Sequence, residues 1–240
     1  MSEVAAVLRH IRTRLPDLRN TKLGPEYSYA SLPLCVIDAV YSVGVRYTPT
    51  IPRTVQNWCL RQQRQWAIYR TAGSSEHSIE DFVKLLDGHD FEALARDVFS
   101  NRQRTSTSSG ILKAEAVYRF ARVLRDFHIN VFGDTEDATL NQSVEKAIRK
   151  IPGQKSGISF SYFLMLAGSD KFVKADRMIC RFVAEAIQAS KTVSPAMAQS
   201  LVVEASSELK REIPGLTPRL LDYAIWTYQR QVRPARASRN

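Results

Sequence analysis

The sequence has 240 residues and a mass of 27.2 kDa, and 44% of the residues are hydrophobic and 24% charged. This length is enough for one large domain or two small ones, and the composition excludes a chain that is disordered or fibrous throughout. No apolar run reaches the length of a membrane span and no signal peptide is recognisable, so we expect a cytoplasmic protein.

The chain is basic, with 34 Lys and Arg against 24 Asp and Glu and a net charge of +10. Such an excess favours a polyanionic partner, usually nucleic acid, although a basic protein without such a partner is the alternative. The cysteines are Cys35, Cys59 and Cys180, which form no CxxC pair, and the four histidines show no ligand spacing. We therefore expect reduced thiols, no metal site and no cofactor.

Apolar residues recur at helical spacing along nearly the whole chain, and strand-like alternation is rare. In chain order, the apolar faces lie within residues 34–41, 82–98, 117–124, 179–187 and 220–228. Five prolines stand where helices would start, because a missing N–H costs nothing there: Pro33, Pro49, Pro52, Pro195 and Pro218. The sequence predicts an all-α fold.

The segment 151–159, IPGQKSGIS, combines turn and helix signals. Pro152 disfavours helix immediately before it, and Pro-Gly is typical of a turn. Gly153 and Gly157 flank a tight loop, and a strongly apolar helix is expected to start at Ile158. Two helices would thus be joined by a short hairpin, and backbone N–H groups at the N-terminus of the second helix would suit a phosphate.

This segment resembles the helix-hairpin-helix DNA glycosylase superfamily. The hairpin of that family opens with an apolar residue, Pro and Gly, as Ile151-Pro152-Gly153 does, and a catalytic aspartate heads the next helix. Asp176 falls at that place, and DRMICRF, which starts there, is similar to the family's Asp-Thr-His-Ile-x-Arg-Val, with Arg181 at the arginine. Weaker similarity, in the same order along the chain, is seen at Tyr41-Ser42, 111–114, Leu221-Asp222 and Trp226.

The resemblance implies one helical domain of two lobes over residues 1–228. Residues 50–150 would form one lobe. Residues 1–49 and 151–228 would form the other, which would carry the hairpin at 151–159. Residues 229–240 would be a basic and flexible tail, because they contain arginines and almost no apolar residues.

The resemblance also implies a monomeric enzyme that hydrolyses the bond between a flipped base and its deoxyribose in double-stranded DNA, leaving an abasic site. Asp176 would be catalytic, because a carboxylate near the sugar stabilises an oxocarbenium-like state and activates water. Ser42 and Gly44 would belong to the base pocket. The residues expected to contact DNA are Gly153, Gln154, Lys155, Ser156, Gly157, Ile158, Ser159, Arg46, Tyr47, Lys174 and Arg177.

The sequence departs from the family pattern at several positions. Lys155 stands at the second glycine of the hairpin, and Gly157 or Ile158 stands at the lysine that gives bifunctional members their lyase activity. No cysteine quartet for an iron–sulfur cluster follows the core. A monofunctional member without a cluster is therefore expected, while Lys155 and Lys174 leave a lyase activity open.

Each signal also has a simpler interpretation. Asp176 could be only a helix cap, and the 151–157 loop an ordinary turn between helices. A non-catalytic helix-hairpin-helix DNA-binding module is the competing function, and a structural interaction protein is a third. A solvated helix face or a phosphate-binding rim would explain the basic group Arg102, Arg104, Lys113, Arg119, Arg122 and Arg125.

The sequence does not identify the base. An alkylated, deaminated or oxidised base would place the protein in base excision repair, and a bulky modified base of viral DNA would place it in antiviral defence. Trp58, Trp66 and Trp226 are expected to pack in the core rather than to stack on bases, because large aromatic side chains usually pack.

Overall fold

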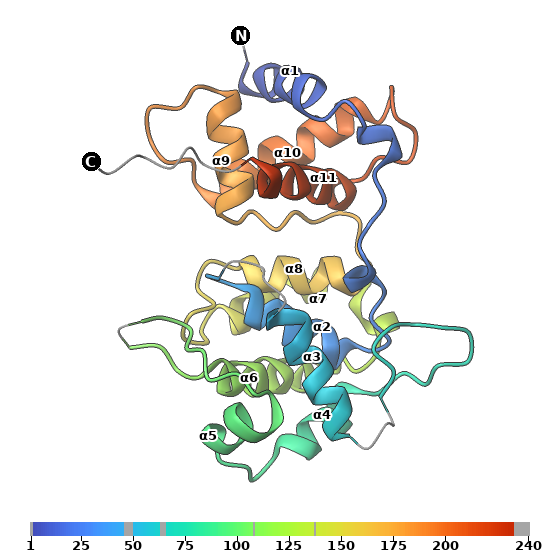
Figure 1. The fold of residues 1–240 in the computed structure, drawn as a ribbon, viewed down its shortest axis with the longest axis vertical. Helices are drawn as coiled ribbons and strands as arrows, with labels where there is room; N and C mark the ends of the chain where they lie inside the picture. The colour runs from blue at the N-terminus through green and yellow to red at the C-terminus, as the bar shows by residue number, and fades with distance from the viewer. Residues whose placement is uncertain (1, 46–49, 63–65, 108, 137, 233–240) are drawn as a thin grey trace. The chain divides into compact units, whose positions relative to one another are not determined.

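The computed structural model describes residues 2–45, 50–62, 66–107, 109–136 and 138–232, without the side chains of 138–141. All regular elements within these ranges are helices (Figure 1). Extended pairing there is limited to isolated antiparallel bridges, between Tyr29 and Tyr69 and between Arg104 and Leu112. The all-α fold class is thereby confirmed. None of the described helices is long and apolar enough to cross a membrane.

The chain divides into two compact units. The middle unit is Gly24–Ser169, and the terminal unit combines Met1–Leu23 with Asp170–Asn240. Residues 24–49 and 151–169, which the resemblance assigned to the same lobe as the two chain ends, lie in the middle unit. The reason is packing between distant segments, because α2 (Leu32–Ser42) contacts α3 (Thr50–Arg61) and α6 (Lys113–Asp126) as well as α8 (Ile158–Leu166).

The middle unit is built around α2, whose eleven residues are all buried. A helix that is apolar on every side is typical of a central position, and α3, α6 and α8 pack against it. The elements of this unit are η2 (Pro25–Ser28), α2 (Leu32–Ser42), α3 (Thr50–Arg61), α4 (Ile79–Leu86), α5 (Phe91–Ala93), the π-helix η3 (Leu94–Val98), α6 (Lys113–Asp126), η4 (Phe132–Thr135), α7 (Ala138–Ile148) and α8 (Ile158–Leu166).

Aromatic side chains fill the middle unit next to α3. The Trp58 ring meets Phe82 edge to face at a centroid distance of 4.7 Å and stacks near Phe99 at 5.9 Å. Trp66 lies edge-on to Trp58 at 5.4 Å. Both tryptophans are buried, which confirms that they belong to the core. Trp226 is only half-buried and stacks on Tyr223.

The terminal unit has its own core, which both ends of the chain supply. Val7 and Ile11 of α1 share this core with Phe182 of α9, Val202 of α10 and Ile225 of α11. The elements are α1 (Glu3–Arg14), η1 (Leu18–Asn20), α9 (Arg177–Ala186), α10 (Pro195–Leu209) and α11 (Pro218–Gln231). Because α11 continues through Gln231, the start of the expected tail is helical, and residues 233–240 lie outside the described part of the chain.

Helix starts follow the sequence signals closely. Pro33 and Pro52 lie in the first turns of α2 and α3, and Pro195 and Pro218 are the first residues of α10 and α11. These placements confirm the prediction, since a first-turn proline removes no intrahelical hydrogen bond. Pro49 lies outside the described residues.

Candidate functional site

The segment between α7 and α8 folds into two successive turns. The Ile151 carbonyl accepts the N–H of Gln154 at 2.9 Å, and the Gln154 carbonyl accepts the N–H of Gly157 at 3.0 Å. Gly153 and Gly157 have φ angles of +86° and +78°, in the left-handed region that favours glycine. Pro152 followed by Gly153 is the residue pattern of a type II turn. The predicted hairpin between two helices is therefore present.

The second helix of the hairpin, α8, begins at Ile158 as predicted. The Gly157 carbonyl accepts the N–H groups of Phe160 and Ser161, each at 3.1 Å, which closes the first turn. The earliest N–H groups of any α-helix have no carbonyl of their own helix to bind. Phosphate binding by these groups stays a prediction of the sequence.

The side chains of the hairpin differ in exposure. Lys155 and Ser156 are exposed, whereas Gln154 is 2% and Ser159 1% exposed. Among the described residues, Gln154 Oε1 and Ser159 Oγ have no hydrogen-bond partner. A DNA contact by Gln154 or Ser159 would therefore involve the backbone, while Lys155 can present its ammonium group.

Two neighbours hold the hairpin in place. Arg149 Nε donates to the Lys155 carbonyl at 2.9 Å, and its guanidinium pairs with Glu145 at 3.1 Å. Gly153 lies so close to the Thr105 side chain that a Cβ atom at this position would overlap it. The hairpin conformation thus depends on a glycine for both its φ angle and its space.

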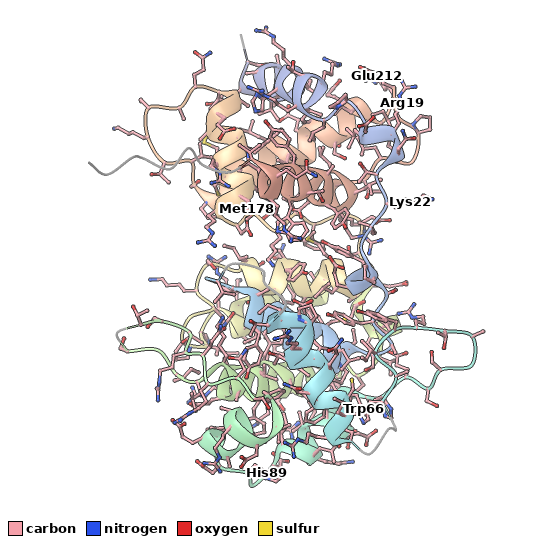
Figure 2. All side chains as sticks on the ribbon, in the orientation of Figure 1. Arg19, Lys22, Trp66, His89, Met178 and Glu212 are labelled. Atoms are coloured by element: carbon pink, nitrogen blue, oxygen red, sulfur yellow. The ribbon has the colours of Figure 1, made fainter. Side chains whose placement is uncertain are left out.

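Asp176 is the N-cap of α9, as expected from the resemblance. Its Oδ1 accepts the N–H of Met178 at 2.7 Å and that of Ile179 at 3.4 Å. Met178 is labelled at the start of this helix in Figure 2. Asp176 is half-buried, so the helix N-terminus stabilises a carboxylate that retains access to solvent. The next residue, Arg177, is exposed.

A second acid, Asp222, lies in the same unit and interacts with Asp176. Asp222 is 3% exposed and its Oδ1 accepts the backbone N–H of Lys174 at 2.9 Å. Burial, and then the negative charge of Asp176, raise the pKa of Asp222 well above its ordinary value, although Lys174 acts in the opposite direction. Lys174 itself is 8% exposed, so little of this expected DNA contact reaches solvent.

Hydrogen bonds between side chains tie α9 to α11. Arg181 Nε donates to Gln229 Oε1 at 2.6 Å, and Gln229 Nε2 donates to Glu185 at 3.5 Å. Gln229 is buried, so this contact lies within the core of the terminal unit. Arg181, the residue that resembles the recurrent arginine of the family, therefore fixes the helix that Asp176 caps.

The residues expected to form a base pocket lie at the end of α2. Ser42 is buried and its hydroxyl donates to the Ala39 carbonyl at 3.3 Å. Gly44 is exposed, has a φ angle of +75° and faces open space. Arg46 and Tyr47 lie outside the described residues. The structure thus places Ser42 and Gly44 next to each other in the middle unit.

Comparison with known proteins identifies a family. Residues 5–230 match the model of a family described as a domain of unknown function, DUF8548. The chain belongs to the DUF8548 family. Neither the curated proteins nor the solved structures provide a match. The DUF8548 match runs through both compact units, from α1 into α11.

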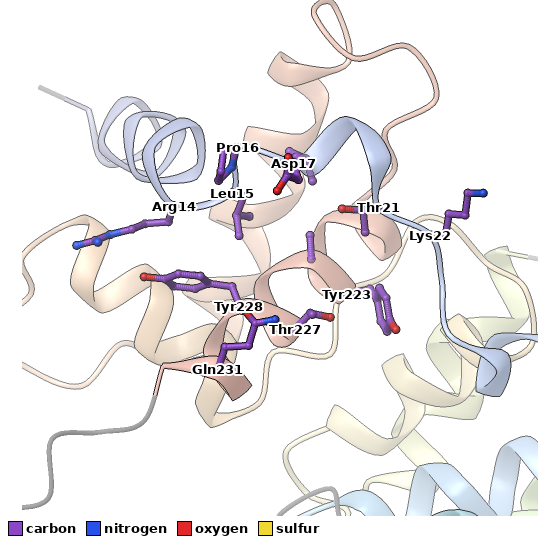
Figure 3. A pocket seen from close by; sticks show the side chains of 12 residues that line it. Arg14, Leu15, Pro16, Asp17, Thr21, Lys22, Tyr223, Thr227, Tyr228 and Gln231 are labelled. Carbon is purple, nitrogen blue, oxygen red and sulfur yellow. The ribbon is translucent and has the colours of Figure 1, made fainter.

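A cavity of about 530 Å³ lies in the terminal unit of this DUF8548 chain (Figure 3). Tyr223, Thr227 and Tyr228 of α11 form one side, and Arg14 and Lys22 come from the opposite segment. Neither of the two interacting aspartates lines it. The cavity is therefore separate from the pair formed by Asp176 and Asp222.

The buried cysteines of the DUF8548 chain have raised pKa values. Burial raises the pKa of the Cys35 thiol and raises that of Cys59 to about 11, so both thiols are neutral and unreactive near pH 7. All three cysteines are free. Within the described ranges, no three His, Cys, Asp or Glu side chains are grouped so as to hold a metal ion.

Two residues acquire meaning only from the structure. In the sequence, Asp222 is marked only by its resemblance to a late aspartate of the glycosylase family. An acid among the apolar residues Leu221, Ala224 and Ile225 nevertheless indicates a buried carboxyl group. Lys113 was grouped with a basic surface, but it is 2% exposed and fits neither a solvated face nor a phosphate rim. Its Nζ donates instead to backbone carbonyls at the end of α2.

Proposed function

We propose that the chain is a monofunctional DNA glycosylase that hydrolyses the N-glycosidic bond of a flipped, damaged or modified base. The observation that carries the proposal is the position of Asp176. Its carboxylate is half-buried at the N-terminus of α9, where it accepts two backbone N–H groups. Helix α9, the next helix after α8, thus begins with a carboxyl group that accepts backbone hydrogen bonds.

A carboxylate of this kind suits the chemistry of base removal. Departure of the base leaves positive charge on the deoxyribose, and a fixed negative charge stabilises that state more than it stabilises the neutral substrate. The same carboxylate accepts a proton from the attacking water, which then bonds to the sugar carbon. The products are the free base and an abasic site.

The charge distribution supports a nucleic-acid substrate. The terminal unit, which carries Asp176, contains 17 Lys and Arg against 9 Asp and Glu. The middle unit contains 17 Lys and Arg against 15 Asp and Glu. Most of the net charge of +10 therefore belongs to the smaller, terminal unit. Electrostatic attraction to the phosphate backbone of DNA would be strongest there.

Lys155 and Lys174, which leave a lyase activity open, differ in their exposure to solvent. Lys174 is buried and its backbone is engaged by Asp222, whereas Lys155 is exposed in the hairpin of the other unit. A lyase needs an amine that can attack the sugar carbon. A buried Lys174 suits this role poorly, so strand cutting before alkali treatment would point to Lys155 instead.

Base release tests the proposal directly. Purified protein is incubated with duplexes that carry alkylated, deaminated, oxidised or bulky modified bases, and the products are analysed before and after alkali. Asp176→Asn keeps an acceptor for the Met178 N–H, so it is expected to fold but to lose roughly 10²–10⁴-fold in rate. Glu204→Gln, at an exposed acid of α10 in the same unit, is the matched control. Release by Asp176→Asn at the wild-type rate would rule out this assignment.

A non-catalytic DNA-binding module is the second candidate. The observation in its favour is that the hairpin is complete within the middle unit, whereas Asp176 belongs to the terminal unit. Such a module would bind duplexes with a steep salt dependence, because phosphate contacts release counterions. Salt-sensitive binding without base release from any duplex of the panel would favour the module over the enzyme.

A further inference from the structure

The segment that leads into Asp176 is held at a single residue, Lys174. Lys174 donates its backbone N–H to Asp222 at 2.9 Å, and its carbonyl accepts the N–H of Asp176 at 2.5 Å. The backbone of Lys174 therefore links the two acids. Val173 and Ala175, on either side of it, are buried in the core of the terminal unit. The side chain of Asp176 is thus held by backbone N–H groups of α9. The backbone that precedes it is held by Asp222.

Asp222 has an unusual place for an acid. It lies on the face of α11 that enters the core, between Leu221 and Ala224. Burying a carboxyl group costs free energy unless hydrogen bonds or neighbouring charges compensate. Its carboxyl oxygen accepts a hydrogen bond from the backbone N–H of Lys174. An uncharged carboxyl group or an amide oxygen can accept the same hydrogen bond. A position that tolerates this cost is a candidate for a specific role.

We infer that Asp222 is a positioning residue for Asp176, because it anchors the backbone of Lys174 and so fixes where the cap and its carboxylate lie. This inference rests on the proposed function, since positioning matters only if Asp176 acts on a substrate. Catalytic groups need their geometry fixed by neighbours, because a small displacement reduces the rate strongly.

The environment of Asp222 favours a different protonation state from that of Asp176. Burial and the Asp176 charge raise the pKa of Asp222, which favours its neutral form beside a charged Asp176. The nearby groups that bear on this balance are Asp176, which favours protonation of Asp222, and Lys174, which opposes it.

The test compares two substitutions at this position. Asp222→Asn keeps an oxygen that accepts the Lys174 N–H and imitates the neutral acid, whereas Asp222→Ala removes the acceptor. We expect Asp222→Ala to lower single-turnover base release by at least tenfold with DNA affinity within twofold. Asp222→Asn is expected to restore most of the wild-type rate. Glu204→Gln serves as the control, because this acid is exposed on α10 in the same unit.

A second readout does not depend on catalysis. Hydrogen exchange of the Lys174 amide reports directly whether Asp222 protects it. We expect exchange to accelerate at least tenfold in Asp222→Ala and to remain slow in Asp222→Asn. Unchanged exchange in Asp222→Ala, or unchanged base release by a folded Asp222→Ala, would overturn the inference. A third outcome separates the two proposals. If exchange is slow only when Asp222 is present but wild type releases no base, Asp222 anchors the Lys174 backbone without a catalytic role. The proposed function would then be rejected.

Discussion

The Nζ of Lys113 donates to the Tyr41 carbonyl at 2.7 Å, and the same nitrogen donates to the Val43 carbonyl at 2.8 Å. Lys113 thus provides a side-chain cap for the last carbonyls of α2, which have no partner in their own helix. Tyr41 also donates its hydroxyl to the Asn101 carbonyl at 3.3 Å. The end of α2 is therefore tied to two later segments of the middle unit.

Replacement of Lys113 tests this cap. Lys113→Met keeps the length of the side chain but leaves buried carbonyls without a donor, so we expect the free energy of unfolding to fall by about 2–3 kcal/mol. Urea denaturation provides the measurement. Lys150→Met, at an exposed lysine, should change stability by less than about 0.5 kcal/mol. Equal effects of the two substitutions would show that the Lys113 contacts contribute nothing.

The hairpin gives a second prediction. Gly153→Ala introduces a Cβ at a φ angle of +86° and against Thr105, so we expect a loss of stability of more than about 1–2 kcal/mol. Gly73→Ala, at a φ of +81° in open space, isolates the cost of the backbone angle. The nearest atom is the Thr105 Cβ, so Thr105→Gly combined with Gly153→Ala, compared with Thr105→Gly alone, should recover the difference between them. The absence of any such recovery in thermal unfolding would contradict the packing explanation.

Asp176 has a structural role that can be separated from the proposed chemistry. Asp176→Ala removes the acceptor for Met178 and Ile179, so we expect the free energy of unfolding to fall by about 0.5–2 kcal/mol. Asp176→Asn retains a capping oxygen and should lose much less. Chemical denaturation of both variants distinguishes the two. If both variants were equally destabilised, the charge rather than the cap would determine the stability.

The buried acid predicts a pH dependence of stability. Because the folded pKa of Asp222 is raised, the native state binds the proton more tightly than the unfolded chain. The contribution of Asp222 is therefore fully present at pH values below its ordinary value of 3.8 and is lost as the pH rises through the raised folded pKa. Asp222→Asn has no such proton. The stability of this variant relative to wild type should increase with pH over that window, as measured by denaturant unfolding at a series of pH values.

Local signals in the sequence were sufficient for the hairpin and its flanks. Pro152, Gly153 and Gly157 determine two turns through their own backbone preferences, and Asp176 caps the next helix with its own side chain. These features involve neighbours in the sequence. They are therefore visible without the fold.

Features that depend on distant partners were not visible. The burial of Lys113 follows from the carbonyl end of α2, which lies far from it in the sequence, and the role of Asp222 follows from a backbone N–H at Lys174. The extent of the middle unit likewise depends on the packing of α2 against α8. A lysine or an aspartate has the same local pattern whether its partner is water or a remote peptide group.

The terminal unit joins the two ends of the chain around an uninterrupted middle. Helix α1 packs against α9 and α10, so it lacks its native partners until ribosomal synthesis has passed residue 209. The middle unit has all its segments as soon as residue 169 has been made. Vectorial synthesis thus imposes an order on folding, in which the middle unit assembles first and α1 remains without partners during that time.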